Sequence, residues 1–146
     1  MHRKFQGYSL VELVIVIACT AVFVSAAVPN FSRLQQQWAL LGGARILESS
    51  MQWGRMHAIS ANTSVRFQVD NAGRMFYWDD PATGNRYEDS VRYLPWGVRI
   101  VSKPQKQLRF FQHGNAVPAG TYKIQREAES YSVVVSPGGR IRVQKN

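Results

Sequence analysis

The sequence contains a single cysteine, Cys19, and it lies inside a long apolar run. An intramolecular disulfide framework and a cysteine-based metal site are therefore excluded, so the folded part must be stable through packing alone. The chain has only three histidines, and none of them has the spacing of a metal-binding motif. Glycine-rich phosphate loops and nucleophile elbows of the G-x-S-x-G type are also missing. We therefore expect no enzyme, no metal site and no cofactor.

Acidic residues are half as common as basic ones, with 9 Asp and Glu against 18 Lys and Arg, and the formal net charge is +9. The excess is concentrated in residues 91–146, where ten Lys and Arg face only Glu127 and Glu129, a balance of +8. A basic half of this kind suggests a polyanionic partner. The alternative is a generally solvated basic surface, which composition alone supports equally well.

An apolar run extends from Tyr8 to Val28 and includes one carboxylate, Glu12. As a helix it would be about 31 Å long, close to the thickness of one hydrocarbon core. A carboxylate at that depth costs about 2.5–3.5 kcal/mol on insertion scales, which makes Glu12 a functional candidate. Its natural partner is a positive group contributed by another chain.

Two simpler interpretations of this segment remain open. A secretory signal would have a basic start and a cleavage site, which Ser25-Ala26-Ala27 could supply, but its apolar stretch would be shorter. A single-span anchor would keep Arg3 and Lys4 on the cytoplasmic side. Neither interpretation gives a reason for Glu12.

The segment Gly7-Tyr8-Ser9-Leu10-Val11-Glu12 resembles the processing site of type IV prepilins and pseudopilins. The resemblance implies that a prepilin peptidase cuts after Gly7 and that the new amino terminus, on Tyr8, is methylated. It also implies that Glu12 contacts this terminus or the terminus of a neighbouring subunit. Members of the family usually have Phe at the first mature position, where this chain has Tyr8. Pro29 matches a proline that commonly kinks the helix in this family.

The sequence predicts an α+β fold, in which a long amino-terminal α-helix, membrane-spanning in its first half, packs on a carboxy-terminal antiparallel β-sheet head. We expect a leader at residues 1–7, a transmembrane and filament helix at 8–30, and a globular head at 31–146. The helix should continue to about residue 61, because apolar residues recur there at helical spacing (Leu40, Ala44, Leu47, Met51 and Ala58).

From Thr63 the apolar period changes to two, which predicts strands. Val65, Phe67 and Val69 alternate with polar residues, and residues 71–73 turn the chain into a second strand at 74–78. Further strands are expected at 98–102, 108–112, 122–125 and 132–135. The head is therefore expected to contain one or two antiparallel sheets.

The clearest hairpin lies at the carboxy terminus, with Pro137-Gly138 expected at the centre of a type II turn. In the strand that follows, alternation sends Arg140 and Arg142 to one face and apolar residues to the core. Two guanidinium groups about 6.6 Å apart suit neighbouring phosphates. We expect Gly138 and Gly139 to leave the backbone bare for a close approach, and Lys145 to extend the patch. The alternative is an edge strand protected by charge against aggregation.

The leader and tail, together with residues 110–115 and 133–140, resemble the GspH/FimT family of minor pilins and pseudopilins. FimT-type minor pilins of this family are linked to natural transformation and bind DNA through a carboxy-terminal Gly-Arg-x-Arg motif. That motif matches Gly139, Arg140, Ile141 and Arg142. The family has further basic contacts in loops, for which the candidates here are Lys103, Lys106, Lys123 and Lys145.

The resemblance implies a minor type IV pilin that binds double-stranded DNA for uptake. Its other partners would be other pilins, the prepilin peptidase and the inner membrane. It would cross the inner membrane once, with its head in the periplasm, before it joins a pilus at the cell surface. Two alternatives share the fold: a structural minor pilin that primes pilus assembly, and a GspH-like pseudopilin of a type II secretion system.

Overall fold

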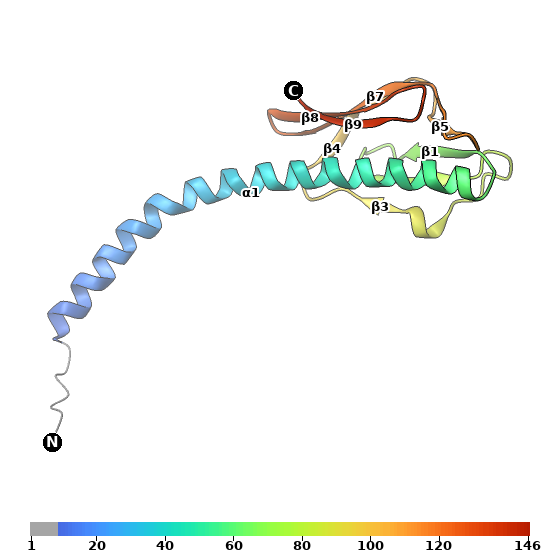
Figure 1. The fold of residues 1–146 in the computed structure, drawn as a ribbon. Coiled ribbons are helices and arrows are strands. Elements are labelled where there is room, and N and C mark those ends of the chain that lie inside the picture. The colour runs from blue at the N-terminus through green and yellow to red at the C-terminus, as the bar shows by residue number, and fades with distance from the viewer. Residues whose placement is uncertain (1–8) are drawn as a thin grey trace, which may run out of the picture. The chain divides into compact units, whose positions relative to one another are not determined.

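The computed structural model describes residues 9–146 in two compact units, one ending at Gln35 and one comprising Gln36–Asn146. The expected leader, Gly7 and Tyr8 lie outside the described residues. Helix α1 runs from Leu10 to Ser60, where the sequence placed its end at about residue 61 (Figure 1). In the part of the chain that the structure describes, no helix is both long and apolar enough to cross a bilayer.

Ser9 caps the first turn of α1. The Oγ of Ser9 accepts a hydrogen bond from the Val11 N–H at 3.3 Å, and the Ser9 carbonyl accepts one from the Leu13 N–H at 3.2 Å. Glu12 lies in this first turn. A carboxylate in the first turn also stabilises the positive end of the helix dipole. Glu12 is therefore placed where its charge favours the start of the helix.

The second half of α1 supplies one side of the core. Leu40, Ala44, Leu47, Met51 and Ala58 are all buried, which confirms the expected apolar face of the helix.

Gly54 lets the helix approach the sheet closely, because a Cβ there would meet the ring of the fully buried Trp78. The Trp78 indole N–H donates to the Ser50 Oγ at 3.0 Å. The contact is therefore apolar across most of the ring and polar only at this nitrogen.

The head contains two antiparallel sheets, which confirms the predicted fold class. The five-stranded sheet has the order β3-β2-β1-β5-β6, and the four-stranded sheet has the order β4-β7-β8-β9. The strands of the first sheet are β1 (Val65–Val69), β2 (Met75–Asp79), β3 (Arg92–Tyr93), β5 (Arg109–Phe110) and β6 (Ala116–Val117). Those of the second are β4 (Arg99–Ser102), β7 (Gly120–Arg126), β8 (Glu129–Val135) and β9 (Ile141–Lys145).

The two sheets share one core. The rings of Phe67 in β1 and Tyr122 in β7 meet edge to face, with centroids 5.4 Å apart. Three short elements were not predicted from the sequence: strands β3 and β6, which have two residues each, and the 3-10 helix η1 (Glu88–Ser90). Two residues are too few to establish an alternating apolar pattern, so these strands depend on their neighbours.

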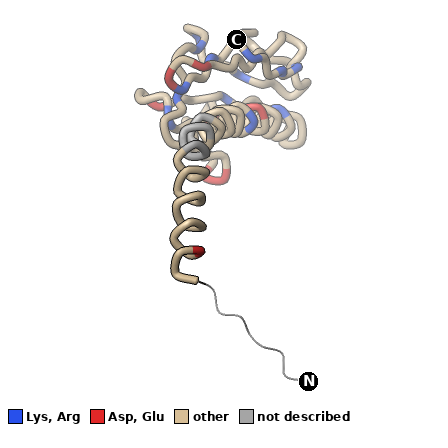
Figure 2. Tube along the Cα trace, turned by 90° about the vertical axis from the view of Figure 1, so that its left-hand side faces the viewer, with Lys and Arg blue, Asp and Glu red and all other residues tan. Residues whose placement is uncertain are grey.

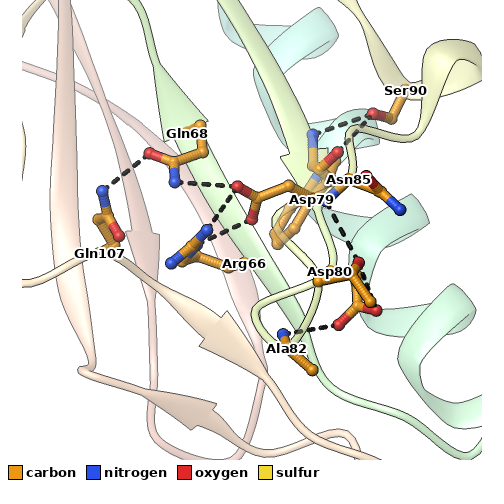
Figure 3. Close-up of polar contacts among 10 residues, drawn as sticks. Arg66, Gln68, Asp79, Asp80, Ala82, Asn85, Ser90 and Gln107 are labelled. Carbon is orange, nitrogen blue, oxygen red and sulfur yellow. Dashed lines mark hydrogen bonds and ion pairs between the residues drawn. The ribbon is translucent and has the colours of Figure 1, made fainter.

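A polar network covers the outer face of the five-stranded sheet (Figure 3). Arg66 donates two hydrogen bonds to the Asp79 carboxylate, at 2.8 and 2.7 Å, and Gln68 donates a third at 3.1 Å. The hydrogen bonds to Asp79 raise the pKa of the Arg66 guanidinium. Because Asp79 is buried and Arg66 is bound to it in a bidentate manner, this arginine has a structural role and is not a candidate for ligand binding.

Candidate nucleic-acid interface

The terminal hairpin turns differently from the expectation. The Gly139 N–H donates to the Ser136 carbonyl at 2.9 Å, and the Ser136 N–H donates to the Arg140 carbonyl at 2.9 Å. A type II turn requires a positive φ at Gly138, but the positive φ of 76° belongs to Gly139. The expected type II turn is therefore wrong. The loop has three residues and ends in a left-handed glycine, a geometry that matches the twist of the flanking strands.

Gly139 is also not the bare stretch of backbone that was expected. It is buried, and a Cβ at this position would overlap the Gly114 carbonyl and lie 2.8 Å from the Arg55 Nε. The first glycine of the Gly-Arg-x-Arg motif therefore allows the hairpin to pack against the 111–115 loop. Gly138 is exposed, and nothing lies within 4 Å of its missing side chain.

The two arginines of the motif point away from the core. Arg140 and Arg142 are exposed, whereas Ile141 and Val143 are half-buried and pack against the core. This confirms the alternation predicted for the strand. The Arg140 N–H donates to the Ser136 Oγ at 3.1 Å, which fixes the backbone from which the first arginine projects.

The register of the four-stranded sheet brings other basic residues to the same side as Arg142. Paired residues form rows across β9, β8 and β7. One row contains Arg142, Val134 and Thr121, and the next row on the same face contains Gln144, Ser132 and Lys123. Directly paired residues share a face, so Lys123 and Arg142 lie on one face with their Cα atoms about 12 Å apart. Arg99 joins this face through its pairing with Gln125.

We call Arg99, Lys123, Arg140 and Arg142 the basic face. None of the residues that the register places in its rows is acidic. The face opposite contains Tyr122, Ile124 and Val133, which are buried in the core.

The other candidate lysines lie elsewhere. Lys145 pairs with Tyr131, which pairs with the buried Ile124, so Lys145 is on the opposite side of β9 and does not extend the arginine pair. Lys106 lines a separate hollow of about 530 Å³. Lys103 is exposed and directly follows Ser102, the residue that pairs with Lys123.

The ion pairs among the described residues do not involve the basic residues of the carboxy-terminal half. The ion pairs among the described residues are Arg45–Glu48, Arg66–Asp79 and Arg86–Glu88, and none includes a residue after position 91. Glu127 and Glu129 instead accept hydrogen bonds from the side-chain amides of Gln36 and Gln37, each at 3.2 Å. Figure 2 shows the acidic and basic positions along the chain.

Arg55, which α1 places beside the hairpin, was not among the residues predicted for the site. Its Nε donates to the Gly114 carbonyl at 3.1 Å, and the Ala116 N–H donates to the Pro137 carbonyl at 2.8 Å. A pocket of about 410 Å³ lies between α1 and the hairpin, lined by Gln52, Arg55, Met56, Gly138, Gly139, Arg140 and Ile141. No local pattern indicates Arg55, because its contact is with a residue 59 positions away.

The comparisons with known proteins agree with this fold. Residues 43–139 match the family described as Type II transport protein GspH, and residues 2–28 match the prokaryotic N-terminal methylation motif. No curated protein matches the sequence.

Two solved structures illustrate the likeness. The type IV minor pilin FimU of Pseudomonas aeruginosa has a TM-score of 0.62 at 18% identity, covering 76% of this chain and 92% of FimU. The minor pseudopilin EpsH of the Vibrio cholerae type 2 secretion system has a TM-score of 0.59 at 16% identity, covering 73% of this chain and 96% of EpsH. At these identities the likeness concerns the fold alone.

The family and the fold are those of pilins, which are structural proteins rather than enzymes. Because the GspH match covers more than half of the sequence, the chain belongs to the GspH family, as a minor pilin or pseudopilin of a type IV pilus or a type II secretion system.

Proposed function

We propose that this protein is a minor type IV pilin that binds extracellular double-stranded DNA without sequence preference, for uptake in natural transformation. The observation that supports the proposal most directly is the basic face. Four exposed or half-exposed cations lie on one face of the four-stranded sheet, and no acid occupies the rows between them. Arginine forks suit phosphate oxygens in particular, and two of them stand on successive outward positions of the terminal hairpin.

The basic face would contact the phosphate backbone rather than base edges. Its side chains are spread over a sheet and do not form a helix or ribbon shaped for the major groove. If Arg140, Arg142 and one or two lysines each neutralise a phosphate, the slope of log affinity against log salt should be about −2 to −4. Affinity for a single head would be modest, and several subunits on a filament would increase it through avidity.

The proposal includes the expected processing and location. The prepilin peptidase would cut after Gly7, and Tyr8 would become the methylated amino terminus. Residues 8–30 would hold the chain in the inner membrane, with the head at 31–146 in the periplasm, until it joins other pilins in the filament. Glu12 would then pair with the amino terminus of its own or a neighbouring subunit.

The experiment that tests the proposal measures fluorescence anisotropy of a random-sequence duplex with the full chain in non-ionic detergent, at several salt concentrations. We expect salt-dependent binding that is lost in the double variant Arg140→Gln/Arg142→Gln. A matched control is Arg86→Gln, since Arg86 is already paired with Glu88 on the five-stranded side of the head. Failure of the unsubstituted chain to bind at low salt would contradict the proposal.

A role in assembly or secretion is the second candidate, and the GspH family match and the likeness to EpsH favour it. In that case Arg140 and Arg142 would contact another subunit. Charge reversal at both positions would then abolish pilus assembly or secretion. If their role is DNA binding, the same reversal should leave filaments intact and reduce only DNA uptake.

A further inference from the structure

The pocket between α1 and the terminal hairpin is formed by two parts of the chain that are far apart in sequence. Gln52, Arg55 and Met56 come from the helix, and the segment from Gly138 to Ile141 comes from the hairpin. Its volume of about 410 Å³ lies within the range of about 300–1,000 Å³ that is typical of small-ligand sites. The pocket therefore has room for a group the size of one nucleotide unit.

The charges in the pocket are all of one sign. Arg55, Arg140 and Gln52 are among the residues that line it, and no acid is. Such a lining favours an anion with several oxygen acceptors. Met56, which is 64% exposed, and Ile141 add apolar surface beside the cations.

Arg55 is held in place before any ligand arrives. Its Nε donates to the Gly114 carbonyl, which uses one of its five N–H groups and leaves the terminal nitrogens to bind elsewhere. Ion pairs among the described residues do not include Arg55. A guanidinium fixed in this way loses less conformational entropy on binding than a flexible surface lysine does.

We infer that Arg55 is a further DNA-binding residue, which together with Arg140 holds one phosphodiester group of the bound strand in this pocket. Gln52 donates to the same phosphate, and Met56 and Ile141 lie against the adjoining sugar. The pocket would fix where the strand crosses the edge of the head, and the basic face would attract the rest of the duplex. This inference rests on the proposed function and adds one residue that belongs to no sequence motif.

The test uses the full chain in non-ionic detergent and the same labelled random duplex, at several salt concentrations. In Arg55→Gln we expect about tenfold weaker binding, because one charged hydrogen-bond set is lost. We also expect a salt slope that is smaller by about 0.9, because one phosphate contact is lost. Arg55→Lys should keep the slope and lose only part of the affinity, since the charge remains and the fork does not.

Arg92→Gln is the matched control. Arg92 also donates to backbone carbonyls, those of Asp89 and Val91 at 2.8 Å, but it lies on edge strand β3 of the other sheet. The Arg92→Gln substitution removes one charge and one type of backbone contact without touching the pocket. The salt slope of this variant should therefore match that of the unsubstituted chain. If Arg55→Gln and Arg92→Gln have the same slope and affinity, Arg55 contacts no phosphate and the inference fails.

A second variant covers the case in which Arg55→Gln does not fold. Gln52 is exposed, and Gln52→Glu places an acid in the pocket, one helical turn before Arg55, while Arg55 itself remains. Binding by Gln52→Glu should be several-fold weaker at low salt, and unchanged binding would overturn the inference. If the unsubstituted chain binds no DNA, the proposed function fails, whereas binding that depends on Arg142 but not on Arg55 or Gln52 contradicts only the pocket.

Discussion

Two glycines of α1 should respond to the same substitution with opposite sign. In the middle of a helix, Ala is about 0.8–1.0 kcal/mol more favourable than Gly. At Gly42 nothing lies within 4 Å of the position of the new Cβ, so Gly42→Ala should stabilise the head by roughly that amount. At Gly54 the Cβ would lie 2.5 Å from two atoms of the Trp78 ring and 2.7 Å from a third.

The Trp78 ring has little freedom to move away. It is fully buried, its nitrogen is bound to Ser50, and its centroid lies 5.0 Å from that of Phe67 and 5.6 Å from that of Phe110. Overpacking of this kind costs about 1–3 kcal/mol, and a displaced indole would lose about 1 kcal/mol more with its hydrogen bond. After the gain in helix propensity, Gly54→Ala should destabilise the head by about 2 kcal/mol.

The assay is guanidinium unfolding of the full chain in non-ionic detergent, followed by near-UV circular dichroism, with a thermal scan alongside. At about 4 °C per kcal/mol for a head of this size, Gly54→Ala should lower Tm by roughly 8 °C, and Gly42→Ala should raise it by a few degrees. A Gly54→Ala head at least as stable as the unsubstituted one would show that Trp78 can move, and would refute this account of the contact between helix and sheet.

Three other predictions concern single positions. Gly139→Ala should destabilise the head by about 1–3 kcal/mol in thermal unfolding, because Gly139 has a φ of 76° and faces a carbonyl, while Gly138→Ala should have little effect. Glu12→Gln removes the charge and keeps the size of the side chain, so cell fractionation should find the variant in the membrane and at a reduced level in filaments; normal incorporation would exclude a role for the charge. Burial raises the pKa of Tyr122 above its ordinary value of 10.0, so the folded head retains this proton at a pH where the unfolded chain loses it. Stability should therefore fall as the pH rises above about 10, and it should fall less steeply in Tyr122→Phe. If the guanidinium unfolding midpoints of the two proteins change in parallel between pH 8 and 11, this prediction is contradicted.

The helix and the longer strands could be predicted because their signals are local. Leu40, Ala44 and Leu47 recur on one helical face, and Val65 and Phe67 alternate along one strand, so each pattern alone determines which side is buried. Strands β3 and β6 gave no such signal, because they are stabilised by pairing with β2 and β5 rather than by a pattern of their own. The pairing of distant segments, and thus the order of strands in each sheet, could not be read from periodicity.

In the candidate site too, the positions that depend on a local pattern could be predicted, and those that depend on contacts between distant segments could not. The outward direction of Arg140 and Arg142 follows from alternation within five residues, and the structure confirms it. The position of Lys123 beside them depends on the register of three strands, and the position of Arg55 depends on a contact between α1 and the loop at Gly114. Lys145 was expected to extend the arginine pair. It is three residues after Arg142, however, and this odd spacing in a strand places it on the other face.

The two glycines that precede the arginines differ in their surroundings, and only one of them is required by the packing of the head. Gly138 is exposed and unconstrained by neighbours, whereas Gly139 is buried against a carbonyl from another part of the chain. The sequence Gly-Arg-x-Arg can occur by chance in any basic chain. Its glycine is structurally required only where a loop such as 111–115 packs against the hairpin and leaves no space for a side chain. In this head that packing also brings Arg55 to the pocket that Arg140 lines, so the glycine contributes to the candidate site through the position of the hairpin and not through contact with a ligand.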